Sequence, residues 1–172
     1  MNIRLIEATQ EYKDQIIDFL DEYVASGERV IPTTLTKIDH HDFDQYCEHL
    51  KSRQYPTDPD RVPATIYFTL DEDRHIIVGC VDLRHYLNDH LLSHGGHIGD
   101  GVRPSERRKG CATAQIGLAL QKCKELGIDR VLITCEPWNV GSAKSIINNG
   151  GVLENEVEAE GKIFQRYWID NA

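Results

Sequence analysis

Long apolar runs are absent from this sequence of 172 residues. Runs such as residues 76–78 and 131–133 reach only three residues, whereas a helix that crosses a bilayer needs about 20 apolar residues. The first seven residues contain neither a long apolar core nor a small-residue cleavage site, so they lack the pattern of a secretory signal. We therefore expect no membrane partner and a cytoplasmic protein.

Basic residues are scarce. Lys and Arg number 19 against 28 Asp and Glu, which gives a formal net charge of −9. A nucleic-acid-binding protein usually carries a basic stripe that neutralises phosphates, and the one dense basic run here lies between Arg103 and Lys109. We expect no nucleic-acid partner. The five cysteines are odd in number and form no Cys-x-x-Cys pair, which argues against a disulfide framework and a structural zinc site.

The remaining composition is that of a globular protein, with 40% hydrophobic and 27% charged residues. This mixture excludes a largely disordered chain. The length fits one hydrophobic core, because single cores stop growing near about 250 residues. We expect one domain over residues 1–172.

The hydrophobic pattern alternates between strand and helix periods. Helices are expected from Thr9, as a cap, to Gly27, then around 43–50, 112–123 and 142–148. Strands are expected at 3–7, 64–70, 75–86, 97–103, 131–135, 152–157 and 162–170. Strands that precede and follow helices in this order predict an α+β fold in which helices flank a mixed sheet.

The most informative stretch runs from Val102 to Ala112. Here a strand ends, a basic loop turns at Gly110, and a helix begins with a small residue. The first amides of a helix are unpaired and carry partial positive charge, so such a turn can bind a phosphate through its main chain. A basic helix cap that binds nothing is the alternative. The pattern is neither a P-loop nor a dinucleotide-binding GxGxxG motif.

A second element follows the expected strand at 131–135. Asn139 and Ser142 stand three residues apart at a helix start, and Gly150 and Gly151 end that helix. Plain helix capping explains the polar pair. The same pair could also hydrogen-bond a ligand that lies between two strands.

Together the two elements resemble the GNAT superfamily of N-acetyltransferases. Its signature Gln/Arg-x-x-Gly-x-Gly/Ala is matched by Arg107, Gly110 and Ala112, and its downstream Asn-x-x-Ser by Asn139 and Ser142. Residues 83–85, 88, 95–99, 102–110 and 149–151 look like a branch of predicted acetyltransferases that has no settled substrate. The resemblance covers essentially the whole chain and implies a mostly antiparallel central sheet in an α/β/α sandwich.

The resemblance implies acetyl-CoA as cosubstrate. Its pyrophosphate would lie on the amides of residues 108–112, and its pantetheine arm along the strand edge near Val102. The cofactor-binding residues implied are Val102, Arg103, Arg107, Arg108, Lys109, Gly110, Cys111, Ala112, Thr113, Asn139 and Ser142. At the helix start beside basic residues, Cys111 has features that lower a thiol pKa. We interpret it as a small residue that fits against the sheet.

The implied reaction is direct attack of an amine on the thioester, helped by a general base. The candidates for the catalytic groups are His97, Asp100 and Glu136, with His85 also considered. His97 is preferred because its pKa lies near working pH, although a buried structural histidine is an equal alternative. Asp100 could instead line the acceptor pocket. The family's usual general acid is a tyrosine, but that position is Ile146 here, and Ser142 and Tyr167 are weak substitutes.

His85, His90, His94 and His97 invite a metal interpretation, but no carboxylate stands at a familiar ligand spacing. Polar loop filler is the better explanation, and we expect no metal.

We therefore expect an enzyme that acetylates a small-molecule or peptide amine. The acidic surface mildly favours a cationic acceptor. A GNAT-fold module that binds acyl-CoA without turnover is the main alternative, and an acidic protein-interaction domain is a third. Residues 27–63 would cover the acceptor side, and homodimers are common among relatives.

Overall fold

The strands form two antiparallel sheets in a computed structural model that describes all residues from Met1 to Ala172. The larger sheet has the order β1-β2-β3-β4 and the smaller one the order β5-β7-β6. Their bounds are β1 Ile3–Ile6, β2 Ala64–Asp71, β3 Ile76–Arg84, β4 Ile98–Val102, β5 Arg130–Cys135, β6 Val152–Ala159 and β7 Lys162–Asp170.

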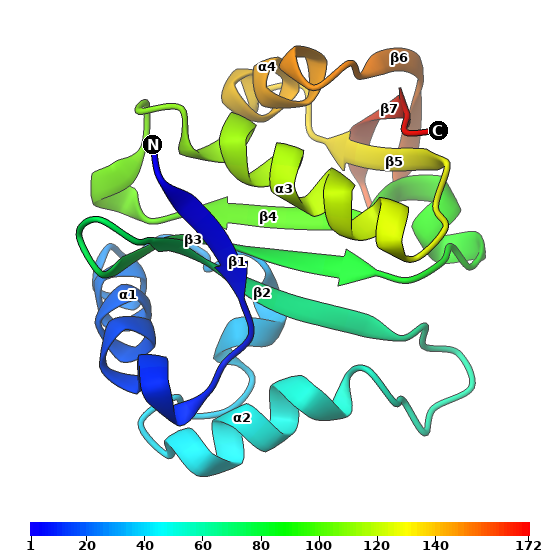
Figure 1. Ribbon diagram of the computed structural model, residues 1–172. Coiled ribbons are helices and arrows are strands. Elements are labelled where there is room, and N and C mark those ends of the chain that lie inside the picture. Colours follow the sequence, from blue (N-terminus) through cyan, green and yellow to red (C-terminus); the bar gives the residue numbers. More distant parts are fainter.

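Four α-helices flank the two sheets (Figure 1). They are α1 Lys13–Ala25, α2 Phe43–Ser52, α3 Cys111–Glu125 and α4 Val140–Asn148. Side chains of α1 and α2 share one apolar core with β2 and β3. Side chains of α3 and α4 share a second core with β3, β5 and β7. The expected sandwich of helices around a mostly antiparallel sheet is confirmed.

The helix ends follow local chemistry. Gly27 and Gly127 both have φ of +74°, a left-handed conformation that glycine adopts without strain at a helix end. At the start of α4, the Asn139 Oδ1 atom accepts a hydrogen bond from the Ser142 amide at 3.1 Å. The expectation for Thr9 was wrong in detail, because Thr9 precedes a short 3₁₀ turn, its side chain makes no capping bond, and α1 begins at Lys13.

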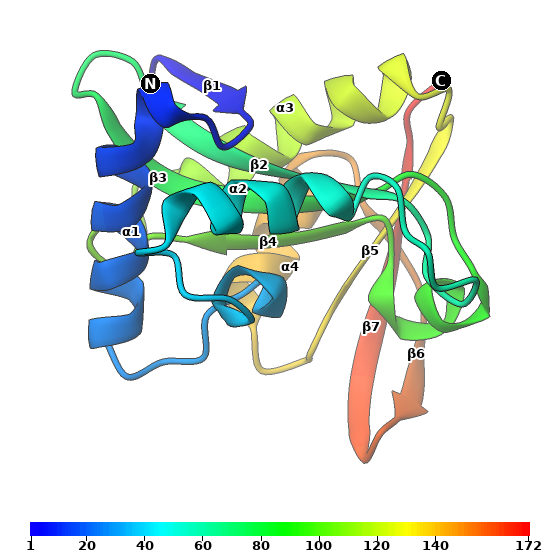
Figure 2. The same cartoon turned by 90° about the horizontal axis from the view of Figure 1, so that it is seen from below.

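The two sheets meet at a single link between β4 and β5. The His97 amide donates to the Leu132 carbonyl at 2.8 Å, and the Leu132 amide donates to His97 Nδ1 at 2.9 Å. Beyond this link no hydrogen bond joins the strands, and the sheet of β5, β7 and β6 turns away from the larger sheet (Figure 2). The edge of β4 is therefore open beside β5.

The connections contain short turns that the apolar pattern did not reveal. They include a 3₁₀ turn at Thr33–Thr36 and a π-helical turn at Leu91–Gly95. Both lie on the side of the sheet where residues 27–63 were expected to cover the acceptor. None of the helices combines the length and the apolar character that a membrane span requires.

Candidate active site

The loop between β4 and α3 is fixed by ion pairs that its own side chains make with the body of the protein. Buried Glu106 accepts two hydrogen bonds from the Arg74 guanidinium, at 3.1 and 2.8 Å. This guanidinium lowers the pKa of Glu106. The Ser105 amide donates to Glu22 in α1 at 2.9 Å. The loop is thus held from two sides.

Two arginines that we expected to contact the cofactor instead contact α1 and the chain just after it. Buried Arg103 pairs with Asp18 at 2.7 Å and with Glu22 at 2.5 Å. Arg107 pairs through both terminal nitrogens with Glu28, at 2.9 and 2.7 Å. Their guanidinium groups are engaged by carboxylates and hold the loop, and the binding of the cofactor by these two residues stays a prediction.

The main-chain amides at the end of the same loop have no hydrogen-bond acceptors. The amides of residues 107–113 donate to no acceptor in the protein. Arg108 and Gly110 have φ of +61° and +84°, and together they turn the chain into the start of α3. The side chain of Arg108 is exposed and makes no ion pair. Consecutive free amides at a helix start, beside a free cation, are an arrangement that suits a phosphate group.

We refer to the free amides of residues 107–113 as the amide cradle. The residues around this cradle pack against the protein or cap helices. Cys111 is buried, and burial raises the pKa of its thiol, so its position at the helix start does not produce a thiolate. The Thr113 carbonyl accepts a hydrogen bond from Asn149 at 3.0 Å, which ties α3 to the end of α4. The oxygen of Asn139 is used for capping, as described above. Val102 ends β4 and accepts a bond from Arg107 Nε at 3.4 Å.

A large cavity lies on the opposite side of β4 from α3. It has a volume of about 930 Å³ and is lined by the chain after α1, the end of α2 with its following loop, the π-helical turn and the β6–β7 hairpin. β3, β4 and β5 each contribute residues to its wall, among them Asp82, Gly99 and Thr134. The amide cradle and the cavity therefore lie near the same open edge of β4.

A sequence model described as Acetyltransferase (GNAT) domain matches residues 6–152. The chain belongs to the GNAT acetyltransferase family. Its members are acyltransferases that use acetyl-CoA, and this GNAT domain has the fold of that activity. No curated protein is significantly similar to the sequence.

Solved structures share the fold. A ribosomal-protein-S5-alanine acetyltransferase from Vibrio fischeri superposes with a TM-score of 0.66 at 17% identity, covering 98% of this chain and 92% of that one. The microcin C7 self-immunity acetyltransferase, solved with acetyl-CoA and AMP, gives 0.67 at 18%, covering 98% and 92%. A spermidine/spermine N-acetyltransferase from Vibrio cholerae gives 0.64 at 14%, covering 99% and 94%. At these identities the likeness concerns the fold.

Within the GNAT domain, His97 cannot be the base that we preferred. Its Nδ1 accepts the Leu132 amide, so the neutral ring carries its proton on Nε2 and has no free lone pair. Burial, with the nearby Arg84 guanidinium, lowers the pKa of His97 to about 4. The alternative, a buried structural histidine, is what the geometry supports. His85 is also engaged, with its Nε2 at 2.8 Å from Thr65 Oγ1.

The two carboxylates lie on different sides of the sheet. Asp100 Oδ2 accepts from Gln115 in α3 at 3.0 Å, and burial raises the pKa of Asp100. It faces α3 and does not line the large cavity, so this cavity does not support the suggestion that Asp100 lines the acceptor pocket. Glu136, just after β5, does line the cavity. Its side chain is 26% exposed and lies 3.7 Å from Lys162 Nζ.

The expected tyrosine is missing in structure as well as in sequence. Ile146 lies in α4 and is fully buried in the second core, so no group at this position reaches a thiol. Tyr167, considered as a substitute, is also buried and donates its hydroxyl to Gln165 at 3.0 Å. Burial raises its pKa.

The structure contains two clusters of side chains that we did not predict from the sequence. In one, His94 of the π-helical turn and His90 just before it approach Glu160 of the β6–β7 hairpin, with ligand atoms within 4.8 Å of one another. The missing carboxylate of the histidine motif thus comes from a distant hairpin. In the other, Asp21 Oδ1 accepts from His40 Nε2 at 2.7 Å and lies 2.9 Å from His41 Nε2.

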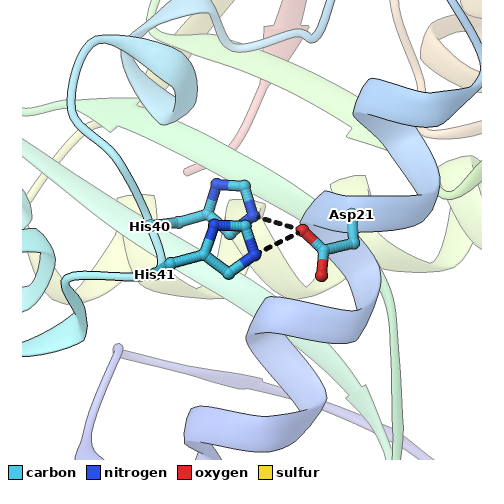
Figure 3. A group of neighbouring side chains, drawn as sticks. All are labelled: Asp21, His40 and His41. Carbon is cyan, nitrogen blue, oxygen red and sulfur yellow. Dashed lines mark hydrogen bonds and ion pairs between the residues drawn. The ribbon is translucent and has the colours of Figure 1, made fainter.

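Figure 3 shows both imidazole rings turned toward the Asp21 carboxylate of α1. The contact fastens the chain before α2 to α1, at the rim of a smaller cavity of about 590 Å³. The Asp21 carboxylate, with Asp39, raises the pKa of exposed His41. These three side chains satisfy one another and explain how residues 39–41 are held.

Proposed function

We propose that the protein transfers the acetyl group of acetyl-CoA to a primary amine by direct attack in a ternary complex. The observation that carries this proposal is the run of amides at residues 107–113, which have no acceptor in the protein and stand at the start of α3. The diphosphate of acetyl-CoA supplies the acceptors that these donors need. Arg108 supplies the free positive charge, while Arg103 and Arg107 hold the loop in place.

The thioester would reach the acceptor along the open edge of β4. An extended pantetheine arm can pair with such an edge as an added strand does. Because β4 separates from β5 just beyond His97, the acetyl group would arrive where the cavity of about 930 Å³ begins. The amine would enter from the cavity side, so donor and acceptor meet without a covalent enzyme intermediate. No free thiol takes part, since Cys111 and Cys135 are both buried and burial raises the pKa of each.

Glu136 is the best candidate for the general base. An alkyl ammonium has a pKa near 10.4, so only about one molecule in 10³ is neutral at pH 7. Of His97, Asp100 and Glu136, only Glu136 lines the cavity, and its contact with Lys162 at 3.7 Å is too long for a hydrogen bond. It would take the proton that the amine loses on attack.

Asp100 is our candidate for the acid that protonates the leaving thiolate. It lies on β4, on the α3 side, and burial raises its pKa, so a larger fraction is protonated than for an exposed aspartate. The hydrogen bond from Gln115 holds the side chain in place. This assignment replaces the tyrosine whose position is occupied by Ile146.

A non-catalytic acyl-CoA-binding module is the second candidate, and the buried Ile146 favours it. A screen of primary amines with acetyl-CoA, read by release of free thiol, separates the two. Coenzyme A should raise the melting temperature in either case. Thiol release with at least one amine supports the enzyme, and a thermal shift without release across the screen supports the module. No shift with coenzyme A would contradict both.

A further inference from the structure

Three buried polar atoms of the molecule have no hydrogen-bond partner, and all three belong to residues that line one cavity. They are His49 Nε2, Asp82 Oδ1 and His94 Nε2. Buried side-chain polar atoms in proteins are nearly always paired. Three exceptions around the same cavity of about 930 Å³ indicate that its walls are built to hydrogen-bond a ligand.

Asp82 is the most informative of the three. Its side chain is only 3% exposed, and its Oδ2 lies 3.2 Å from Arg53 and 3.4 Å from Arg84. One carboxylate oxygen thus faces two guanidinium groups while the other, Oδ1, accepts nothing. An oxygen of this kind matches a donor such as an ammonium group.

The backbone places this carboxylate beside the reacting edge. Asp82 lies in β3, directly opposite Gly99 of β4. A Cβ at Gly99 would meet the Arg84 guanidinium at 3.2 Å, so the absence of a side chain there leaves room for Arg84 next to Asp82. β4 therefore presents no side chain of its own at this point, and the cavity wall is completed by β3.

The charge of the cavity differs from that of the chain. Its lining includes six basic and five acidic residues, whereas the whole chain carries a net charge of −9. Exposed Arg29 and Lys37 line it and make no ion pair. Burial lowers the pKa of His49, and the charges of Arg53 and Lys37 add to this effect. The expectation of a cationic acceptor, which rested on the net charge of the chain, therefore does not apply to this cavity.

We propose that the acceptor is a small zwitterionic amine, whose amino group donates to Asp82 Oδ1 and whose anionic group, a carboxylate or a phosphate, is held by the basic residues of the cavity. The inference rests on the proposed acetyl transfer and names its substrate class. A polyamine lacks the anionic group and meets uncompensated positive charge at Arg29 and Lys37. A simple alkylamine satisfies Asp82 alone.

The test uses matched amines and the full-length protein loaded with coenzyme A. O-Phosphoethanolamine is compared with ethanolamine, L-alanine with L-alaninamide, and spermidine stands for the polycations. Calorimetry measures binding, and thiol release from acetyl-CoA measures turnover. We expect the anionic member of at least one pair to bind about tenfold or more tightly than its neutral partner, and more tightly than spermidine. The pair that shows the preference identifies phosphate or carboxylate.

Variants locate the preference. Asp82→Asn should weaken binding of the preferred amine at least about tenfold, because the amide removes the charge that attracts the ammonium. Asp71→Asn is the matched control, since Asp71 is also buried and paired with an arginine but lies outside the cavity. Arg29→Gln with Lys37→Gln, both exposed, should erase the difference within the preferred pair. An unchanged coenzyme A thermal shift shows that each variant is folded.

The outcomes separate the two proposals. Tighter binding of ethanolamine, L-alaninamide or spermidine, equal binding within both pairs, or no binding of any of these amines overturns the inference. Unchanged amine affinity in Asp82→Asn does so as well. Selective binding of a zwitterion without thiol release leaves the inference standing and contradicts the proposed catalysis.

Discussion

The two halves of the candidate site offer different kinds of atoms to a ligand. The donor side offers main-chain amides, and the acceptor side offers side-chain atoms. On the donor side, the side chains of Arg103, Glu106 and Arg107 form ion pairs within the protein, whereas the main-chain amides at 107–113 have no acceptor. On the acceptor side, the strand amides and carbonyls around Asp82 are paired within the sheet, and the unpartnered atoms belong to side chains.

This difference has a physical consequence. Amides are present in every residue except proline, so a cradle made of them depends on the path of the chain and tolerates many side chains. A pocket made of side-chain atoms depends on each residue type. An acetyl donor that a whole family shares is suited to a site made of amides. An acetyl acceptor that is particular to one member is suited to a site made of side chains.

The largest effect is expected from a change that damages the cradle and leaves the cavity untouched. Gly110→Asp introduces a carboxylate and a disfavoured backbone conformation at φ +84°. Loss of two charge-assisted hydrogen bonds, at about 1.5–3 kcal/mol each, predicts a 10²- to 10⁴-fold fall in coenzyme A affinity by calorimetry. Gly127→Asp is the control, because Gly127 has a similar φ of +74° and equally open surroundings at the other end of α3. Equal affinity in the two variants would contradict the cradle.

The link that His97 makes between the two sheets should be sensitive to acid. The pKa of His97 is lowered to about 4 in the folded protein, against about 6.5 when unfolded. The unfolded state therefore binds more protons between these values, and stability should fall as pH drops from about 6.5 to about 4, by up to roughly 3 kcal/mol. Urea unfolding at a series of pH values measures this. His97→Gln should flatten the dependence in that window. If this variant also loses the acidic limb of the pH–rate profile, the structural role assigned to His97 is wrong.

On the acceptor side, Glu136→Gln tests the cavity separately from the cradle, because it changes one side chain in the cavity and leaves the cradle intact. We expect kcat to fall about 10²-fold, as is typical when a general base is removed. The thermal shift produced by coenzyme A should be unchanged. Glu156→Gln provides a surface control on the neighbouring hairpin. A kcat within a few-fold of the unaltered enzyme would remove Glu136 from the role.

The smallest effect is expected where the loop is fastened to α1. Arg103→Met removes the partner of Asp18 and Glu22, of which Asp18 is largely exposed. Solvent screening of these carboxylates limits the loss to about 1–2 kcal/mol of unfolding free energy, or several degrees of melting temperature for a chain of this size. Because the amides keep their order only while the loop is held, coenzyme A affinity should fall modestly as well. Lys122→Met, which breaks an exposed pair with Glu125, should leave the melting temperature within about a degree.

Local features of the site could be predicted from the sequence. Gly110 and Gly127 stand where left-handed residues are needed at the two ends of α3, and Asn139 caps α4 three residues before its amide partner. These depend on neighbours within a few positions, so a single sequence contains them. The succession of helices and strands along the chain and the family pattern around Arg107, Gly110 and Ala112 were recognisable for the same reason.

The roles of charged side chains could not be predicted in this way. The family resemblance implied that Arg103 contacts the cofactor, but its side chain pairs with Asp18, which lies 85 residues earlier in the chain. Glu160 lies on the β6–β7 hairpin and comes close to His90 and His94. No spacing rule connects these positions in the sequence. His97 has a suitable ordinary pKa, yet its free nitrogen is consumed by the Leu132 amide.

The turn at Gly110, the helix and strand periods and the kinship with acetyltransferases can be recognised from the sequence alone, because these depend on backbone preferences over short distances. Which polar groups are left without partners follows instead from how the chain packs in three dimensions. Whether a donor or a charge is free depends on what packs against it from distant parts of the chain. That packing paired Arg103 and Arg107 of the loop with carboxylates, left the loop amides without acceptors, and left one buried oxygen of Asp82, a residue that lines the cavity, without a partner.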